Sequence, residues 1–130
     1  MNKLIIELSG DIPSKKNSRI TLRNGRTIPS KRFQVWHDIA IVMTKLAVQK
    51  QIKTYSYTSN LMSYNIDITF YMGTKRRTDI DNKVSSILDM LVDAGVLEDD
   101  DWTHVPSIQA RAVYRKGQPG ATITMSPTVL

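Results

Sequence analysis

The sequence contains no cysteine, which excludes a disulfide framework, a thiolate nucleophile and a cysteine-ligated zinc site. Its two histidines, His37 and His104, are too few for a histidine-rich metal site. Long hydrophobic runs are also absent. The N-terminal apolar run extends only from Leu4 to Ile6, too short for the core of a signal peptide, and no stretch approaches the ~20 residues of a membrane span. We therefore expect a soluble protein of the cytoplasm.

Negative charge is scarce. The chain has 12 acidic and 18 basic residues, for a net charge of +6 at pH 7. Such a balance predicts an anionic partner, and nucleic acid before an acidic membrane. The length of 130 residues and the apolar fraction of 41% are typical of one globular domain with one core. We expect residues 1–130 to form that domain.

The apolar pattern predicts an α/β domain with a mixed sheet and two main helices, in the order β-α-β-α-β-β. The first helix follows Ser30, a typical N-cap, and the second begins near Asn82 and ends at Gly95. The expected strands are residues 4–8, 61–72, 108–115 and 121–126, with a small hairpin at 20–29 around Asn24-Gly25 and a second hairpin loop at 116–120. In the first helix, the residues that recur at helical spacing are Phe33, Trp36, Ile39, Ala40, Met43, Leu46 and Ala47, and we expect them to face the core.

The segment "KRRTDIDN", residues 75–82, concentrates opposite charges between a strand and a helix. In extended backbone, residues two apart point the same way, so Asp79 and Asp81 could both face one cation. Mg²⁺ prefers such oxygen ligands. The alternative is that these acids only cap the helix, because acidic residues collect at helix N-termini.

A second acidic cluster, Glu98 to Asp101, follows the second helix. It is either a solvated turn or the source of a further metal ligand. The helix between the two acidic segments is roughly 20 Å long. A ligand from the second cluster must therefore fold back along the helix or come from a second subunit.

Two groups of basic residues could contact DNA phosphates. The first, Lys75, Arg76 and Arg77, directly precedes the paired acids. The second lies near the N-terminus and around the predicted hairpin, and consists of Lys15, Lys16, Arg19, Arg23 and Arg26.

Two stretches resemble the RusA-type Holliday junction resolvases. "RRTDIDNKVSSILDMLVDAGVLEDD", residues 76–100, is similar to the core motif of that family, and "PSKKNSR", residues 13–19, is similar to its start. The resemblance implies a bacterial or phage homodimer that depends on Mg²⁺, with Mn²⁺ as a substitute. It also implies that four-way DNA junctions are resolved by paired symmetric nicks in recombination and repair.

The resemblance also assigns residues. It implies that Asp79 and Asp81 are the paired metal-binding and catalytic aspartates and that Asp100 is the third. The residues that match supporting positions are Asn82, Asp89 and Asp99. The family's lysine, four residues after the second aspartate, is replaced here by Ser85. We take Lys83, two residues earlier, as a further DNA-binding candidate. The acidic cluster is one residue longer, so Asp99 and Asp101 remain alternatives to Asp100.

Two other functions fit the same residues. In a non-catalytic nucleic-acid-binding module, Asp79 and Asp81 would serve only as helix caps. In a metal-dependent nuclease of another specificity, the substrate would be a flap, other branched DNA or plain duplex.

Overall fold

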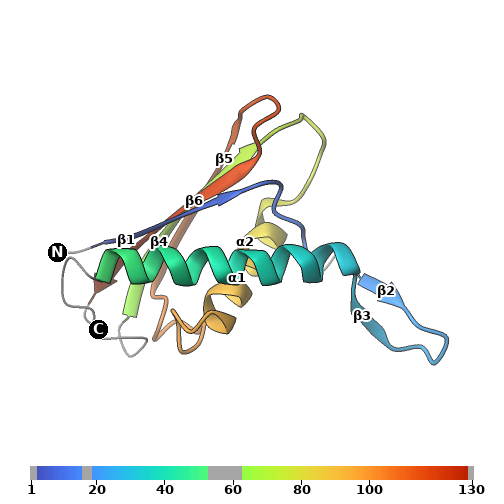
Figure 1. Cartoon of the computed structure of the whole chain (residues 1–130), viewed down its shortest axis with the longest axis horizontal. Coiled ribbons are helices and arrows are strands. Elements are labelled where there is room, and N and C mark those ends of the chain that lie inside the picture. Colours follow the sequence, from blue (N-terminus) through green and yellow to red (C-terminus); the bar gives the residue numbers. More distant parts are fainter. Residues whose placement is uncertain (1–2, 16–18, 53–62, 129–130) are drawn as a thin grey trace.

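The computed structural model describes residues 3–15, 19–52 and 63–128 (Figure 1). The described elements, in chain order, are β1 (Leu4–Ser9), β2 (Arg19–Thr21), β3 (Thr27–Pro29), α1 (Lys31–Ile52), β4 (Ser63–Met72), α2 (Ile80–Asp93), β5 (Ser107–Tyr114) and β6 (Gly120–Thr128). A four-stranded sheet has the order β1-β6-β4-β5, and β2 pairs only with β3. β4 and β5 are parallel and the other pairs antiparallel, so the prediction of a mixed α/β sheet with two helices is confirmed.

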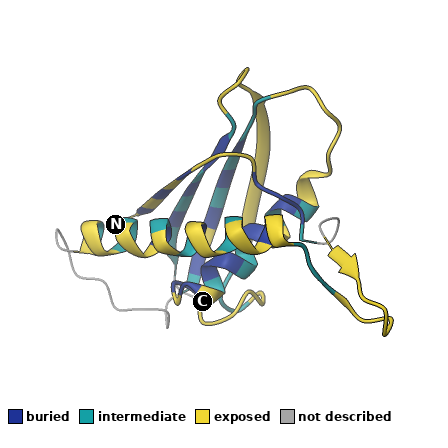
Figure 2. Ribbon diagram, turned by 45° about the vertical axis from the view of Figure 1, so that its right-hand side comes forward, coloured by how far each residue is buried: buried dark blue, intermediate teal, exposed yellow. Residues whose placement is uncertain are grey.

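The core lies between one face of this sheet and the two helices. Apolar side chains alternate inward along β1 and β4, which is the period of two that a half-buried strand requires (Figure 2). The largest fully buried side chains of the sheet include Tyr64, Phe70 and Met125, and α2 adds Ile87 and Leu91. The opposite face of the sheet is polar and carries the Asp67–Arg111 ion pair at 3.0 Å. The helices therefore cover a single face.

Three local signals set the boundaries that the sequence predicts. Ser30 caps α1, since its Oγ accepts a hydrogen bond from Phe33 N at 3.2 Å. Gly95, with φ of 79°, ends α2 by donating to the Val92 carbonyl, while the next amide bonds the Leu91 carbonyl. This is a Schellman pattern, and it needs a residue that tolerates positive φ. The hairpin between β2 and β3 turns at Gly25, with φ of 82°.

The prediction of a hairpin between the last two strands is wrong. β4 lies between β5 and β6, so residues 115–119 carry the chain past the end of β4. The connecting residues bond that end instead: Arg115 N donates to the Met72 carbonyl at 2.8 Å, and Gly117 N to the Gly73 carbonyl at 3.0 Å. A short loop with glycine and proline fits a hairpin between adjacent strands and also a connection that passes a third strand. Its composition alone therefore does not identify the neighbouring strand.

Two further expectations need correction. α2 begins at Ile80, two residues before the predicted start, so Asp81 is helical and not extended. In α1, Phe33 and Ala40 are buried as predicted, but Ile39 and Leu46 point to solvent with exposed fractions of 55% and 61%. The helix carries apolar residues on two sides, and periodicity alone did not separate them. The predicted polar connection at 53–60 lies outside the described residues.

Candidate active site

Residues 73–79 join β4 to α2 and carry the three cations of the charged motif. Lys75, Arg76 and Arg77 are exposed, and none forms an ion pair with an acidic residue in the described ranges. The Lys75 ammonium instead lies 5.2 Å from the centre of the Tyr114 ring. These cations are therefore held at a surface where a phosphate can replace water as their partner.

Asp79 occupies the N-cap position of α2, with extended backbone at φ −84° and ψ 126°, but its side chain makes no cap hydrogen bond. Among the described residues, its carboxylate accepts a hydrogen bond only from the Asn82 side-chain amide, at 3.5 Å. The Asp81 carboxylate accepts a hydrogen bond from the Asn82 backbone N–H at 2.9 Å. Both side chains are exposed. The capping alternative is not supported at Asp79, because a capping carboxylate bonds the free N–H of the second or third helical residue.

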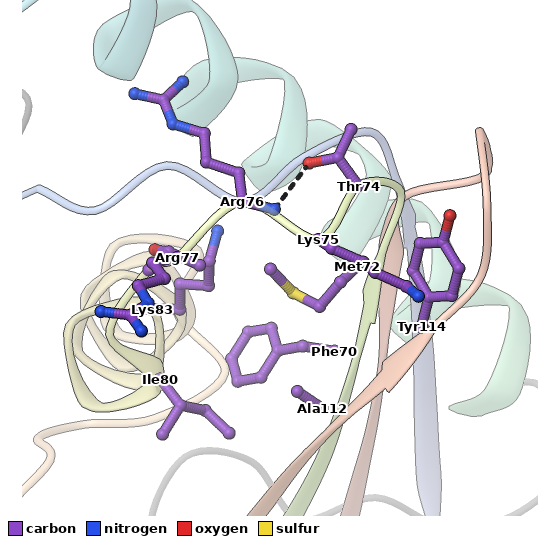
Figure 3. A pocket seen from close by; sticks show the side chains of 11 residues that line it. Phe70, Met72, Thr74, Lys75, Arg76, Arg77, Ile80, Lys83, Ala112 and Tyr114 are labelled. Atoms are coloured by element: carbon purple, nitrogen blue, oxygen red, sulfur yellow. Dashed lines mark hydrogen bonds between the residues drawn. The ribbon is translucent and has the colours of Figure 1, made fainter.

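A cleft of about 610 Å³ lies beside Asp79, between the 73–79 loop and the segment that follows β1. Its charged lining residues are Asp11, Arg32, Arg76, Arg77, Asp79 and Lys83. A second cavity on the other side of the loop has an apolar floor that includes Phe70 and Met72, and cations along its rim (Figure 3). The loop is thus accessible from both sides.

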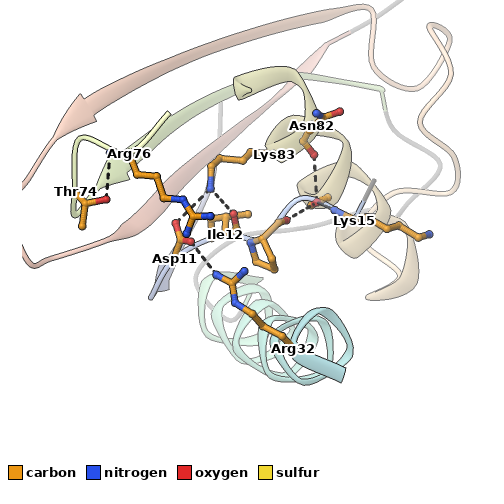
Figure 4. Close-up of polar contacts among 10 residues, drawn as sticks. Asp11, Ile12, Lys15, Arg32, Thr74, Arg76, Asn82 and Lys83 are labelled. Carbon is orange, nitrogen blue, oxygen red and sulfur yellow. Dashed lines mark hydrogen bonds and ion pairs between the residues drawn. The ribbon is translucent and has the colours of Figure 1, made fainter. Parts of the chain in front are cut away.

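Lys83 points inward and not toward bulk solvent. The residue is only 4% exposed, and its ammonium donates to the Ile12 carbonyl and to Asp11 Oδ1 at 3.3 Å (Figure 4). Asp11 also accepts from Arg32 at 3.0 Å. Lys83 thus has partners within the fold. It also lines both cavities, and DNA binding by this residue stays a prediction.

The segment after β1 is held along α2 by side chains one helical turn apart. Besides Lys83, the fully buried Ser86 donates to the Pro13 carbonyl at 2.7 Å and accepts from Lys15 N at 3.1 Å. The Lys15 ammonium pairs with Asp89 at 2.8 Å. We call residues 11–15 the strap. It brings Lys15 and the predicted supporting residue Asp89 into contact.

Arg19 lies on β2, and Arg23 and Arg26 in the adjoining turn, all exposed on the arm formed by β2 and β3. Figure 1 shows this arm extending away from the sheet beyond the N-terminal end of α1. Lys16 lies outside the described residues. The second basic group is therefore divided between the strap and the arm.

The three aspartates of the second acidic cluster differ in their contacts. Asp101 Oδ1 accepts hydrogen bonds from Thr103 and from His104, which lower the pKa of Asp101 to about 2. The hydrogen bond between Asp101 and His104, followed by the charges of Asp101, Glu98 and Asp99, raises the pKa of His104. Asp99 bonds Asp100 N at 2.7 Å. Partial burial, followed by the hydrogen bond and charge of Asp99 and the charge of Asp89, raises the pKa of Asp100. Burial and two acidic neighbours thus act on Asp100, whereas Asp101 is engaged by hydrogen bonds within its own turn.

The described structure does not bring the two acidic segments together. Within residues 3–15, 19–52 and 63–128, no three acidic or histidine side chains lie close enough to bind one metal ion. Asp100 lies near enough to Asp89, on α2, for the charge of Asp89 to contribute to the raised pKa of Asp100. Asp89 lies eight residues after Asp81, about 12 Å along the helix axis. In the ranges that the structure describes, Asp79 and Asp81 are linked only through Asn82, which bonds both carboxylates at the start of α2, whereas Asp100 lies near Asp89, further along the helix.

The sequence of this chain matches one known protein family. The family described as "Endodeoxyribonuclease RusA" matches residues 10–126, which include the strap, the arm, the charged loop and both acidic segments. The chain belongs to the RusA family. It is also 25% identical over 127 residues to the crossover junction endodeoxyribonuclease RusA of Aquifex aeolicus, covering 98% of this chain and 94% of that protein. The RusA family consists of enzymes that hydrolyse DNA, so the expected enzyme class is confirmed.

Sequence reasoning missed two charged residues of the RusA-type cleft, Asp11 and Arg32. Neither belongs to a charge cluster that singles it out, and Arg32 is one of several cations near the start of α1. Their positions depend on the packing of the strap against both helices. Within the described part of this RusA-family chain, neither helix combines the length and the apolar content that crossing a bilayer requires.

Proposed function

We propose that the chain is a Mg²⁺-dependent endonuclease of the cytoplasm that resolves four-way DNA junctions as a homodimer. The observation that carries the proposal is the pair Asp79 and Asp81. Both carboxylates are exposed at the start of α2, and Asp79 makes no cap hydrogen bond. The three cations just before them form no ion pair with any residue that the structure describes. Membership of the RusA family supports DNA as the substrate, and the name of the Aquifex relative supports a crossover junction.

The donor chemistry fits a hard divalent cation. Asp79 and Asp81 offer carboxylate oxygens and no nitrogen or sulfur ligand, which suits Mg²⁺ and also Mn²⁺. Asp100 is the proposed third ligand, because it matches the third aspartate of the RusA-type motif. When bound, the metal ion supplies Lewis-acid activation of water and of the scissile phosphate.

The remaining residues bind and orient the DNA. Lys75, Arg76 and Arg77 attract the phosphodiester backbone and offset its repulsion by the aspartates. Arg19 and Lys15 extend the positive surface along the arm and the strap, and Lys16 lies between them in sequence. Asn82 restricts both carboxylates through its hydrogen bonds, and Asp89 holds Lys15. Two symmetric nicks require two such sites related by a two-fold axis, which a homodimer provides.

The test is cleavage of a synthetic four-way junction, a flap and a linear duplex of the same arm sequences, each with Mg²⁺ or EDTA. We expect paired nicks in opposite strands of the junction with Mg²⁺, little cleavage of the duplex, and none with EDTA. Preferential cleavage of the flap would mean that the substrate is a flap and not a four-way junction. Tight binding with no cleavage of any substrate would favour the non-catalytic module.

A further inference from the structure

α1 has apolar side chains on two opposite sides. Toward the sheet, Phe33 and Ala40 are buried and Trp36 packs against the core. Four other large apolar residues of the helix have exposed fractions between 49% and 61%: Val35, Ile39, Val42 and Leu46. Their spacing puts them on one side of the helix, away from the buried residues, and Figure 2 shows that exposed residues recur along the length of α1. A helix that is apolar on all sides is normally buried on all sides. The outer side of α1 therefore lacks the layer that would cover it.

These four residues have the spacing of a helix-to-helix seam. They are separated by four, three and four residues, which are the a and d positions of a heptad. The stripe is about 17 Å long at 1.5 Å per residue. Their side chains are β-branched or leucine, which pack well as knobs into the holes of a facing helix. A partner helix with the same pattern would complete the seam.

We infer that the outer side of α1 packs antiparallel against α1 of a second copy of this chain, around a two-fold axis near residues 40 and 41. Val35 then lies opposite the partner's Leu46, and Ile39 opposite the partner's Val42. Each contact occurs twice by symmetry. The inference rests on the proposed homodimer and assigns a surface to it.

The charges beside the stripe favour the antiparallel direction. Asp38 is the only acidic residue of α1, and Lys45 follows one heptad later on the same flank. Both are exposed, and neither forms an ion pair with a described residue. Antiparallel packing brings Asp38 toward the partner's Lys45 on both sides of the axis. Parallel packing leaves the two residues about 10 Å apart along the seam.

The arrangement also places the two clefts symmetrically. Arg32, in the first turn of α1, bonds Asp11 in the cleft lining, so each cleft lies near the N-terminal end of its own α1. Antiparallel pairing puts these ends at opposite ends of the seam, roughly 30 Å apart along its axis. The two sites then face two strands of one junction across a shared two-fold axis.

The first test changes the stripe. Ile39→Lys with Val42→Lys sets four ammonium groups along the seam, and both side chains are already more than half exposed, so the monomer should still fold. The control, Ile5→Lys, changes an apolar residue of similar exposure (48%) on β1, away from the outer side of α1. In sedimentation at 1–50 µM without DNA, we expect wild type and control to have twice the mass of the variant.

Junction nicking separates failure of the interface from failure of the function. We expect the variant to nick at least tenfold more slowly than wild type at equal concentration with Mg²⁺. A variant that stays dimeric, or a wild type that nicks as a monomer, overturns the α1 interface and leaves the nuclease function standing. A wild type that nicks no DNA overturns the proposed function, whatever its mass.

A second test determines whether the two α1 helices pack parallel or antiparallel. It uses introduced cysteines, because the chain has no native cysteine. Under mild oxidation, a mixture of Val35→Cys and Leu46→Cys chains should form disulfide-linked heterodimers, whereas Val35→Cys alone should not form linked dimers. Efficient self-linking of Val35→Cys would mean parallel packing and would overturn the antiparallel arrangement. No linking in the mixture would overturn the seam.

Swapping the charges with Asp38→Lys and Lys45→Asp together should restore dimerisation that Asp38→Lys alone weakens about threefold or more.

Discussion

At the scale of single residues, aspartates of the two acidic segments differ in the contacts that they make. Asp101 accepts several hydrogen bonds within its own turn, and its low pKa of about 2 reflects them. Asp79 has only one long contact, with Asn82. A carboxylate that the fold uses is a poor candidate for a ligand, and one that the fold leaves exposed is a better one.

Asp81→Asn tests the metal role most directly. The change keeps the size of the side chain and an oxygen that can accept the hydrogen bond from the Asn82 backbone N–H, so stability should hardly move. If Asp81 is a ligand, loss of one negative charge should lower the single-turnover nicking rate by orders of magnitude. Junction affinity should be kept or rise, because a carboxylate near the phosphates is gone. The rate and affinity are compared with Asp67→Asn, an exposed acid on the outer face of the sheet. Nicking within a few-fold of wild type would restore the capping interpretation.

Residue type predicted some positions better than others. The exposed Asp79 and the loop cations lie in the loop where the charged motif predicts them. Asp81 is also exposed, but it lies inside the helix, which begins two residues before the predicted start. Lys83 could not be placed in the same way. Its long apolar stem permits burial, and only packing of the strap against α2 gives its ammonium the Ile12 carbonyl as a partner.

At the scale of elements, the buried hydroxyl of Ser86 is one of the three α2 side chains that hold the strap. Ser86→Ala leaves the Pro13 carbonyl and Lys15 N–H without their partner and should cost about 1–3 kcal/mol of stability. Ser85→Ala is a matched control in the next position, since its exposed hydroxyl bonds only the Asp81 carbonyl of its own helix. Urea unfolding of both variants measures the difference. Equal stability of the two would mean that the strap is not held by Ser86.

The charged loop is a second element with a measurable contribution. Lys75→Gln with Arg76→Gln should weaken junction binding and reduce the salt dependence of log K by up to about two, because each phosphate contact releases about one counterion. The control is Arg111→Gln with Arg115→Gln, which removes equal charge from the outer face of the sheet, where these side chains contact Asp67 and Tyr71. An unchanged salt slope in the loop variant would place its cations away from DNA.

Element boundaries were largely predictable, but element faces were not. Ser30, Gly25 and Gly95 act through bonds to residues a few positions away, so a short stretch of sequence contains the whole signal. Two residues of the outer stripe of α1, Ile39 and Leu46, were wrongly predicted to face the core because they recur at helical spacing with the buried residues. Which side of a doubly apolar helix meets the sheet depends on the rest of the fold.

At the scale of the whole molecule, the separation of Asp81 from Asp100 raises the question of how many chains build one site. Mixed dimers of Asp81→Asn and Asp100→Asn chains answer it. If each site uses one chain, both sites of the mixed dimer are damaged and nicking stays absent. If each site combines two chains, one site of the mixed dimer keeps both aspartates, and single nicks should reappear on mixing. Gel analysis of a junction labelled on each strand distinguishes these outcomes, with each variant alone as the control.

The strand order was the least predictable feature at this scale. β6 pairs with β1 over residues that lie more than 100 positions apart, and with β4 across the two intervening elements α2 and β5. Neither pairing leaves a local signal. The loop after β5 has a hairpin-like composition, yet it passes over β4 and bonds the end of that strand.

The central place of β6 has a consequence for synthesis. β1 and β4 do not pair with each other, and the strand that joins them comes last in the order of the described elements. A ribosome that has made residues 1–119 has synthesised every other described element but not the strand that unites the sheet. Until β6 leaves the exit tunnel, Leu4, Ile6 and Leu8 of β1 have no neighbouring strand to bond. The chain must therefore complete its sheet after translation of this segment, and its positively charged arm and loop are present in the cell before the core has closed.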